Sequence, residues 1–334
     1  MGALTQKWIQ SDAVDARSQS AKPAVSDEYV YVGGLGEDVY ALSREHGEVE
    51  WTTARDGALS DSSPLYHDGR VYIGSGGGSV YALDGSDGSV LWKHSTDSAV
   101  VSSPIVRDGT LYVGREDGYM LALDADDGSL EWTVDLGAPI FTDVDYSSSA
   151  ELVYVSTRGG HLYAVDAASG TQSWSYTIGT DLDSSAPVVD DDSGQVYYAA
   201  NEIVALGVDS GDPAWVTNFY GTNAGSSPVF DAGRVYAAGA SGKVYALASD
   251  GGIIHNDPDW VFETRETFAS DPALVDGRLL VASLDGALYV LDAASGEEFD
   301  CVMLPSETRS APVIADDEIF IGSRSGSVFA FAFA

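Results

Sequence analysis

The sequence predicts an all-β fold: a β-propeller of eight blades, with four antiparallel strands in each blade and a ring closed by the N-terminal strand. Three observations support this prediction. A unit of roughly 40 residues recurs along the chain. Each unit contains runs that alternate apolar and polar residues. One further outer strand lies at the N-terminus, ahead of the first complete unit.

The second half of each unit carries an apolar anchor followed by a tryptophan. In one copy Tyr245 precedes Trp260, after a short insertion, and in another Tyr289 precedes Phe299, which stands in place of the tryptophan. The last copy begins at Phe329, and the chain ends before its tryptophan. Five copies share one register, in which Tyr40, Tyr81, Leu121, Tyr163 and Val204 precede Trp51, Trp92, Trp132, Trp174 and Trp215.

The first half of each unit has the pattern of a hairpin. Segments such as SSPLYHDGRVYIG (62–74) and SSPIVRDGTLYVG (102–114) place two alternating runs on either side of a turn rich in aspartate and glycine. Small polar residues and a proline precede the first run. Together with the two strands of the second half, each unit has the four strands of one propeller blade.

The N-terminus supplies the strand that the last unit lacks. The segment LTQKWIQ (4–10) places Trp8 where the tryptophan of the final blade belongs, so we expect it to complete the blade that contains Phe320 and Phe329. Pairing of the first and last segments closes the ring and removes an exposed edge. We expect one domain over 1–334, with blades at approximately 20–51, 60–92, 100–132, 140–174, 184–215, 225–260, 268–300 and 308–334 plus 1–10.

The charge of the chain limits its partners. There are 52 acidic and 16 basic residues, which gives a formal net charge of −36. Phosphates would repel such a chain, so we expect no nucleic-acid partner. Only four of the basic residues are lysines, and the dense carboxylate content is typical of a protein adapted to molar salt, where the Debye length is about 3 Å. The alternative is an acidic protein that works at ordinary salt.

The sequence shows neither a membrane segment nor a metal site. No apolar stretch has the length of a membrane span, and no basic segment with an apolar core opens the chain, so we expect no direct membrane insertion. Cys301 is the only cysteine and cannot form an intrachain disulfide. DADDG (124–128) lacks the glutamate that closes a calcium loop. The histidines lack ligand spacing; they are His46, His67, His94, His161 and His255.

The segments ALDGSDGSVLW (82–92) and ALDADDGSLEW (122–132) resemble the quinoprotein, or PQQ-type, repeat A-x-D-x-x-x-G-x-x-x-W. The resemblance implies that the tryptophan docks between neighbouring blades, that the glycine supplies a turn and that the aspartate ties the turn together. Ser43, Gly207 and Ala248 depart from the aspartate of the pattern. The tryptophans to which the resemblance gives this structural role are Trp8, Trp51, Trp92, Trp132, Trp174, Trp215 and Trp260.

The same resemblance raises an enzymatic alternative. Enzymes with this repeat hold pyrroloquinoline quinone (PQQ) and calcium at the propeller axis, and many carry a pair of adjacent cysteines against the cofactor. This chain has one cysteine, and its blades are close to minimal length. We therefore expect no catalytic residues, no metal and no cofactor, with a minimal PQQ-dependent oxidoreductase that uses the axial channel as the alternative.

Arginines gather in two classes of loop that emerge on one face of a propeller. The sequence predicts that this face binds an anionic or carboxylate-bearing ligand, or an acidic segment of a partner. The alternative is that each arginine pairs with a local carboxylate such as Asp56, Glu116 or Glu266. Arg17, Arg55, Arg265 and Arg309 lie in the loops that lead into a blade, together with the aromatic residues Phe141, Phe219, Tyr220 and Phe268, whereas Arg115, Arg158 and Arg324 lie between second and third strands.

Short eight-bladed members of the family that this chain resembles act as scaffolds, for example in outer-membrane protein assembly, or as sensor domains. The resemblance therefore favours a non-catalytic binding or scaffold module for a protein partner or a small anionic ligand. It also favours an extracytoplasmic or cell-surface location. We expect a monomer. The outer-membrane role itself is not part of the expectation.

Overall fold

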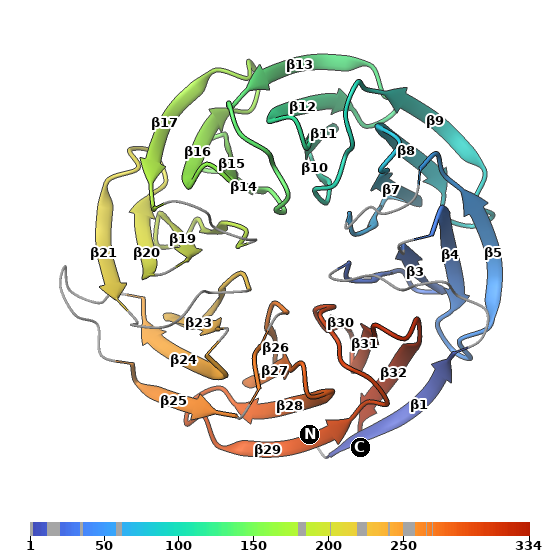
Figure 1. The fold of residues 1–334 in the computed structure, drawn as a ribbon, viewed down its shortest axis with the longest axis vertical. Coiled ribbons are helices and arrows are strands. Elements are labelled where there is room, and N and C mark those ends of the chain that lie inside the picture. The colour runs from blue at the N-terminus through green and yellow to red at the C-terminus, as the bar shows by residue number, and fades with distance from the viewer. Residues whose placement is uncertain are drawn as a thin grey trace.

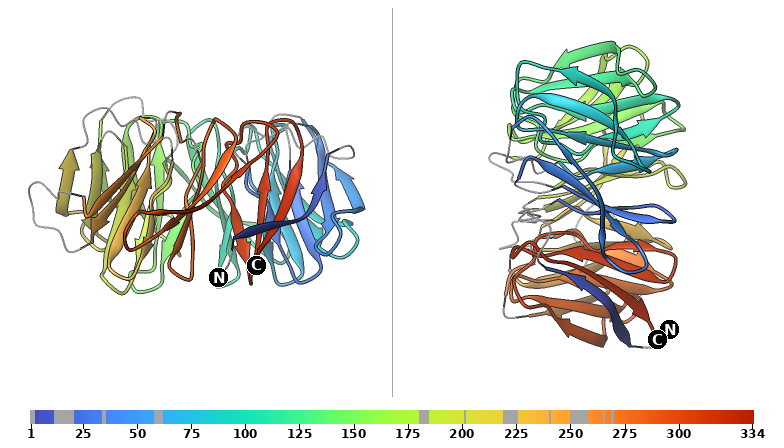
Figure 2. Two further views of the ribbon diagram at one scale, coloured as in Figure 1. Left: turned by 90° about the horizontal axis from the view of Figure 1, so that it is seen from below. Right: turned by 90° about the vertical axis from the view of Figure 1, so that its right-hand side faces the viewer.

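A computed structural model describes residues 3–11, 21–33, 36–57, 62–179, 185–200, 202–218, 226–239, 241–249, 258–264, 266–268 and 270–334. The described strands form eight sheets of four strands each, arranged as blades around a central axis (Figure 1). Figure 2 shows the resulting disc from the side, with loops on both faces. The prediction of an all-β, eight-bladed propeller is confirmed. Within these residues there is no helix that could span a membrane.

Each blade runs from a short inner strand to a long outer strand. Seven blades take their strands consecutively along the chain: β2 (Ala24–Val25), β3 (Tyr29–Gly33), β4 (Asp38–Ser43) and β5 (Val49–Ala54) in blade 1; β6 (Leu65–His67), β7 (Arg70–Gly74), β8 (Ser79–Asp84) and β9 (Val90–Ser95) in blade 2; β10 (Ile105–Arg107), β11 (Thr110–Gly114), β12 (Tyr119–Asp124) and β13 (Leu130–Asp135) in blade 3; β14 (Asp145–Ser147), β15 (Leu152–Thr157), β16 (His161–Asp166) and β17 (Gln172–Thr177) in blade 4; β18 (Val188–Asp190), β19 (Gln195–Ala199), β20 (Glu202–Gly207) and β21 (Pro213–Asn218) in blade 5; β22 (Val229–Asp231), β23 (Arg234–Ala238), β24 (Lys243–Ala248) and β25 (Trp260–Glu263) in blade 6; β26 (Ala273–Val275), β27 (Arg278–Ala282), β28 (Ala287–Asp292) and β29 (Glu298–Met303) in blade 7.

Blade 8 joins the two ends of the chain. Its sheet has the order β1 (Leu4–Gln10), β32 (Val328–Phe333), β31 (Glu318–Gly322) and β30 (Val313–Ala315), with β1 antiparallel to β32. Trp8 is buried against Phe320, with ring centroids 6.0 Å apart, and its Nε1–H donates to the carbonyl of Arg44 at 2.9 Å. The N-terminal strand thus completes the last blade, as the sequence predicted.

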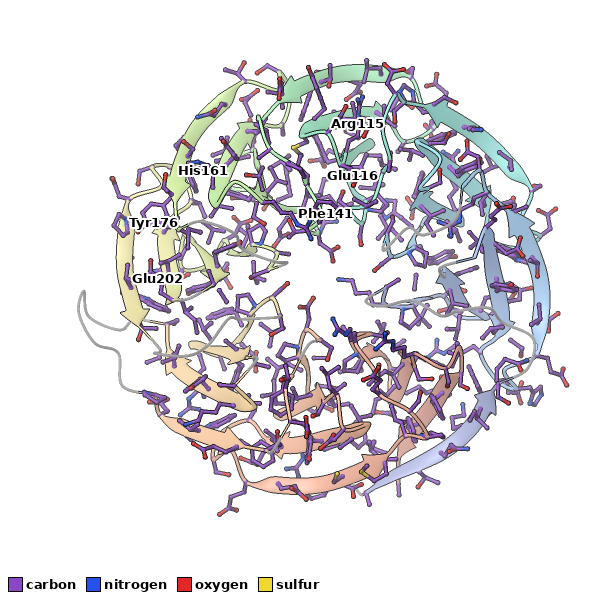
Figure 3. All side chains as sticks on the ribbon, in the orientation of Figure 1. Arg115, Glu116, Phe141, His161, Tyr176 and Glu202 are labelled. Atoms are coloured by element: carbon purple, nitrogen blue, oxygen red, sulfur yellow. The ribbon has the colours of Figure 1, made fainter. Side chains whose placement is uncertain are left out.

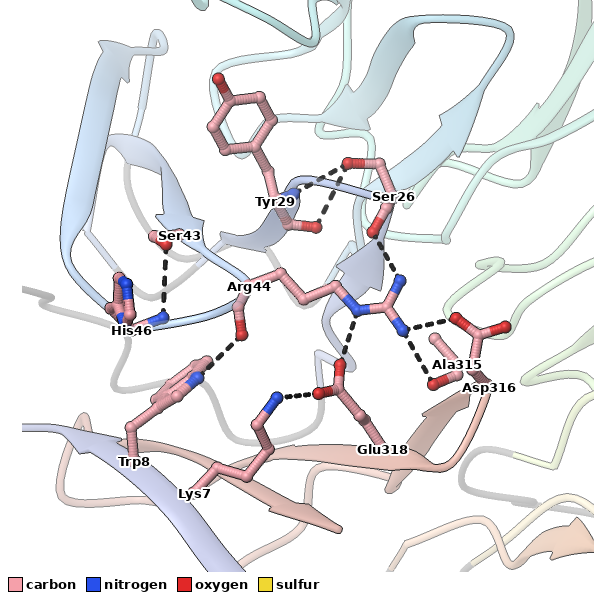
Figure 4. Close-up of polar contacts among 10 residues, drawn as sticks. All are labelled: Lys7, Trp8, Ser26, Tyr29, Ser43, Arg44, His46, Ala315, Asp316 and Glu318. Atoms are coloured by element: carbon pink, nitrogen blue, oxygen red, sulfur yellow. Dashed lines mark hydrogen bonds and ion pairs between the residues drawn. The ribbon is translucent and has the colours of Figure 1, made fainter.

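A polar network reinforces this closure (Figure 4). Arg44, in the turn after β4 of blade 1, donates from Nε to Glu318 of blade 8 at 2.7 Å and from Nη2 to Asp316 at 2.7 Å. Lys7 on β1 forms an ion pair with the same Glu318 carboxylate. The Arg44 and Glu318 side chains are only 13% and 17% exposed, so their attraction is screened less than that of a surface pair. These contacts therefore join blade 1, through Arg44, and strand β1, through Lys7, to Glu318 of blade 8.

The tryptophans of the outer strands link each blade to the next. The Cβ that any other residue would add at Gly88 would lie 2.5 Å from Trp51 Cε3, so only glycine allows the indole to lie flat on the turn. Within the turn, Asp84 Oδ1 accepts from the Ser86 N–H at 2.8 Å. The indole Nε1–H groups donate to carbonyls in the turn of the following blade: Trp51 to Gly85 (3.0 Å), Trp92 to Ala125 (3.0 Å), Trp132 to Ala167 (2.8 Å), Trp174 to Val208 (2.8 Å), Trp215 to Ser249 (2.7 Å) and Trp260 to Ala293 (3.1 Å).

Blade 7 departs from this pattern at a different residue than the sequence predicted. Strand register pairs Val290 with Asp300, as it pairs Ala82 with Trp92 in blade 2, and the intervening Phe299 is a bulge residue. Phe299 is 42% exposed and lies under the Arg278 guanidinium, 3.8 Å from its ring centroid. The expectation that Phe299 replaces the tryptophan is wrong. Asp300 takes that place, and its carboxylate accepts from the Leu4 N–H of β1 at 2.6 Å.

The core is divided among the interfaces between neighbouring blades. One cluster combines Tyr72, Val80 and Trp92 of blade 2 with Val106 and Leu121 of blade 3, and similar clusters recur around the ring. Buried apolar surface therefore stabilises pairs of adjacent blades, and the loops at both faces are carried on a rigid ring.

Candidate functional site

Two classes of loop meet on one face of the disc, which we call the loop face. It consists of the loops between second and third strands and the loops that lead from an outer strand into the next blade. Backbone hydrogen bonds join the two classes: the Glu116 N–H donates to the carbonyl of Ala99 at 2.9 Å, and the Arg158 N–H donates to that of Pro139 at 2.9 Å. The arginines singled out from the sequence belong to these loops.

Arg55 and Phe268 do not lie on the surface of the loop face. Arg55 is 4% exposed, and its Nη1 donates to the carbonyl of Gly74 at 2.7 Å; burial lowers the pKa of its guanidinium. Phe268 is fully buried, packed edge-on against Tyr289 with ring centroids 6.2 Å apart. Both side chains are enclosed by the loops that they hold, so neither is exposed to a ligand in this structure.

Arg115 and Arg324 form the local pairs that the alternative interpretation expected. Arg115 pairs with Asp117 two residues along the same loop and lies over the ring of Tyr119, 5.1 Å from its centroid. Arg324 pairs with Glu307 of the loop that leads into blade 8. These two arginines stabilise loop conformations, and their positive charge is already largely neutralised.

Arg158 and Arg309 are exposed, as is the paired Arg324. The Arg158 guanidinium lies 4.1 Å from the ring centroid of Phe141, which is half-buried. Arg309 makes no hydrogen bond or ion pair with the residues that the structure describes. Phe141 and Glu116 lie toward the axis, with Arg115 farther out (Figure 3). The remaining residues of the predicted set, Arg17, Arg265, Phe219 and Tyr220, lie outside the described residues.

A polar ring that the sequence analysis did not single out lines the axis. It is formed by the residue two positions before the first strand of each blade, and we call it the axial ring. The Lys22 N–H donates to Ser63 Oγ at 3.0 Å, the Ser63 N–H to Ser103 Oγ at 3.0 Å, and the Ser227 N–H to Asp271 Oδ1 at 2.5 Å. The side chains of Ser63, Ser103 and Asp271 thus hold the backbone of the preceding blade. The members are Lys22, Ser63, Ser103, Asp143, Ala186, Ser227, Asp271 and Ala311.

An ion pair crosses the axial ring. Lys22 Nζ of blade 1 lies 2.7 Å from Asp143 Oδ2 of blade 4, and the two side chains are 40% and 27% exposed. The Asp143 carboxylate raises the pKa of Lys22. Burial raises the pKa of Asp143, but the attraction of Lys22 outweighs it and the net shift is downward; burial raises the pKa of Asp271. The ion pair joins blade 1 to blade 4 across the axial ring.

The axial ring does not fit a PQQ–calcium centre. Its two carboxylates are already engaged, Asp143 by the Lys22 ammonium and Asp271 by the Ser227 N–H. In the part of the chain that the structure describes, no group of three or more His, Cys, Asp and Glu side chains is arranged to hold a metal ion. The donors that calcium requires, six to eight oxygens, are not assembled by the described residues at the axis.

The fold and the contacts between tryptophan and glycine define a propeller of PQQ-type repeats. The chain belongs to the family described as outer membrane protein assembly factor BamB, whose sequence profile matches residues 5–73, 58–202, 132–258 and 256–334. The assembly factor BamB of Yersinia pestis is 31% identical over 155 residues, which are 45% of this chain and 37% of that protein. The match thus spans well under two thirds of that relative's length.

Solved structures share the architecture. The crystal structure of BamB from Moraxella catarrhalis superposes with a TM-score of 0.83 at 17% identity, covering 99% of this chain and 100% of that one. The quinohaemoprotein alcohol dehydrogenase of Comamonas testosteroni superposes with a TM-score of 0.81 at 15% identity, covering 99% of this chain and 76% of the enzyme. At these identities the likeness shows the fold alone, so function is argued from the loop face and the axial ring.

Proposed function

We propose that this chain is a non-catalytic scaffold that binds a protein partner through its loop face, without a cofactor and as a monomer. Arg158, exposed and stacked on Phe141, carries the proposal. Arginine and aromatic side chains dominate the energetics of protein interfaces, and a stacked guanidinium is already ordered before it binds. Membership of a family described as an assembly factor supports the same function.

Site-specific photo-crosslinking in cells of the source organism tests this proposal. A photoreactive residue at Glu116 or Ser325, both exposed on the loop face, is expected to give a discrete adduct with another protein. The same residue at Asp68 or Asp108, in exposed turns between first and second strands on the opposite face, serves as the matched control. Adducts of equal yield from both faces, or from neither, would contradict a partner on the loop face.

We also propose that the protein works in a salt-rich environment, because a net charge of −36 repels itself when it is not screened. Thermal unfolding is expected to shift to higher temperature between about 0.2 M and about 3 M potassium chloride, as the Debye length falls from about 7 Å to about 2 Å. A melting temperature that does not change with the salt concentration, or that falls as the salt concentration rises, would indicate an acidic protein that works at ordinary salt.

The location that we propose is extracytoplasmic or at the cell surface. It is supported by the words "outer membrane" in the description of the family and in the name of the Yersinia pestis relative. Accessibility of the protein to protease added to intact or wall-stripped source cells tests it, and complete protection under both conditions would place the protein inside the cell.

A further inference from the structure

Two buried oxygen atoms of blade 5 have no hydrogen-bond partner among the residues that the structure describes. Asp190 ends β18 and is 7% exposed. Its Oδ1 accepts from the N–H groups of Asp192 and Ser193 at 3.1 and 3.3 Å, but its Oδ2 is buried and accepts from no described group. The side-chain oxygen of Gln195, which begins β19, is also buried without a described partner. Buried polar atoms of this kind are rare, and a bound ion or water is a common explanation.

The strand register brings these two oxygens to one place. Asp190 pairs with Gln195 across the hairpin, around a turn at 191–194, so their side chains lie on the same face of the sheet with Cβ atoms about 4.5–5.5 Å apart. A carboxylate oxygen and an amide oxygen are both acceptors, so neither donates a hydrogen bond to the other. Two buried acceptors side by side raise the free energy of the folded chain unless a cation or a donor lies between them.

The turn adds further oxygen atoms and negative charge. Tyr197, two residues after Gln195, lies on the same face of β19, and its hydroxyl is 3.4 Å from Ser193 Oγ. Residues 190–194 read DDDSG, with three acidic residues and no basic one. The sequence around the two buried oxygens therefore favours a cation over an anion.

Asp191 holds this turn against blade 4. Its Oδ2 accepts from the Ser148 N–H at 2.9 Å and from Ser148 Oγ at 2.7 Å, and its Oδ1 accepts from Ser149 Oγ at 2.9 Å. The Asp191 carboxylate is thereby satisfied, and it fixes the backbone next to Asp190. Because the turn is anchored in this way, a ligand that binds to it loses little free energy in ordering the chain.

The acidic turn of blade 3 lacks the buried pair of oxygens. In DADDG (124–128), Asp124 Oδ1 accepts from the N–H groups of Asp126 and Asp127 at 2.8 and 3.1 Å, as Asp190 Oδ1 does in its own turn. However, Asp124 is only half-buried, and neither of its carboxylate oxygens is buried without a partner. Solvent can satisfy that carboxylate. The turn of blade 5 therefore differs in burial from an acidic turn that needs no ligand.

We propose that the turn of the β18–β19 hairpin binds a calcium ion through Asp190 Oδ2 and the side-chain oxygen of Gln195, with water completing the coordination. Calcium accepts both carboxylate and amide oxygens in irregular geometry, whereas magnesium requires a near-ideal octahedron and softer metals select nitrogen or sulfur. Fewer than three acidic side chains supply ligands, so we expect weak binding, with a Kd of about 10⁻⁴–10⁻³ M. The turn lies on the face opposite the loop face, so this site goes beyond the proposed scaffold function and does not depend on it.

Calcium titration of the full-length protein tests the site. The protein is stripped with EDTA, dialysed into about 2 M potassium chloride and titrated with calcium chloride in a calorimeter. At this salt concentration the Debye length is about 2 Å, which screens the general attraction of cations to the acidic surface. One saturable site per chain is expected. Absence of a saturable site would overturn the inference and mean that water or the Gln195 amide nitrogen satisfies the two oxygens.

A pair of variants with the same change of charge locates the binding. Asp190→Asn is expected to weaken calcium binding at least tenfold, because an amide of the same shape replaces the buried carboxylate. Asp127→Asn, in the exposed turn of blade 3, is the matched control and is expected to change the Kd less than twofold. Equal losses in the two variants would mean that calcium responds only to net charge, and an unchanged Kd in Asp190→Asn would place the ion elsewhere; either result refutes the site.

Gln195→Glu tests the same site by a gain of affinity, so the test does not depend on the folding of Asp190→Asn. A second carboxylate beside Asp190 is expected to tighten calcium binding roughly tenfold. It is also expected to lower the melting temperature of the calcium-free protein, because the two carboxylates repel each other, and added calcium is expected to restore it. Calcium affinity that is unchanged or weaker in Gln195→Glu overturns the inference. Magnesium that binds the natural chain as tightly as calcium would refute the assignment to calcium.

Discussion

A chain that begins at Ser11, without β1, is expected to lose the cooperative unfolding transition of the full chain or to melt at a temperature lower by roughly 10 °C or more. Removing a buried tryptophan side chain such as Trp8 alone costs about 3–5 kcal/mol. The deletion also removes the backbone pairing with β32 and the ion pair of Lys7 with Glu318. It leaves β32 as an exposed edge.

Adding the missing strand as a peptide provides the control for this deletion. A synthetic peptide of residues 1–11 is expected to restore part of the lost stability, and the same peptide with Trp8→Ala is expected to restore less, because the contacts with Phe320 and with the carbonyl of Arg44 are absent. Circular dichroism during heating measures both. A truncated chain that melts at the temperature of the full chain would show that the N-terminal strand does not close the ring.

Gly128→Ala is expected to lower the free energy of unfolding by about 2–5 kcal/mol, as the sum of two effects. Gly128 has a φ of +73°, which a residue with a Cβ adopts only with strain, and its Cβ would lie 2.5 Å from Trp92 Cε3. The indole cannot retreat without losing the hydrogen bond from Nε1 to the carbonyl of Ala125. Denaturant unfolding at constant salt measures the change.

Gly109→Ala separates the two effects in the same blade. Gly109 has a φ of +83°, but a Cβ there meets no atom within 4 Å, so the expected cost is the backbone strain alone, about 1–2 kcal/mol. Equal destabilisation by Gly109→Ala and Gly128→Ala would show that the contact between tryptophan and glycine contributes nothing beyond backbone conformation.

Much of the fold follows from repeat spacing. A tryptophan at a fixed distance from an anchor predicts where each outer strand lies, and the glycine of the next unit lies against it because only hydrogen fits under the indole. Blade 7 keeps this spacing without the aromatic residue. Tyr40 precedes Trp51 by eleven residues, as in the next four blades, and the residue eleven positions after Tyr289 is Asp300, where the strand register also places it. The expectation for Phe299 followed the aromatic side chain one residue too early, and Phe299 takes the bulge position that Leu91 takes in blade 2.

The site was less predictable for two physical reasons. A loop arginine can turn inward or outward at the same backbone position, and only the surrounding carbonyls show that Arg55 is enclosed whereas Arg158 is exposed. The pair of Lys22 and Asp143 joins residues 121 positions apart, so their proximity depends on the closed ring. One signal in the sequence could have found these residues. The position two residues before the first strand is serine or alanine in most blades, but it is Lys22, Asp143 or Asp271 in the other three.

We propose that the PQQ-type repeats serve as architecture and that the chain binds through its loop face without a quinone. Equilibrium binding of PQQ to dialysed full-length protein, in molar salt with calcium and followed by dye-linked oxidation of alcohols and sugars, tests this proposal. No stoichiometric binding and no turnover are predicted, because the described carboxylates at the axis are engaged by Lys22 and by the Ser227 N–H. Tight stoichiometric binding of PQQ with turnover would contradict the proposal and make the axial channel an active site.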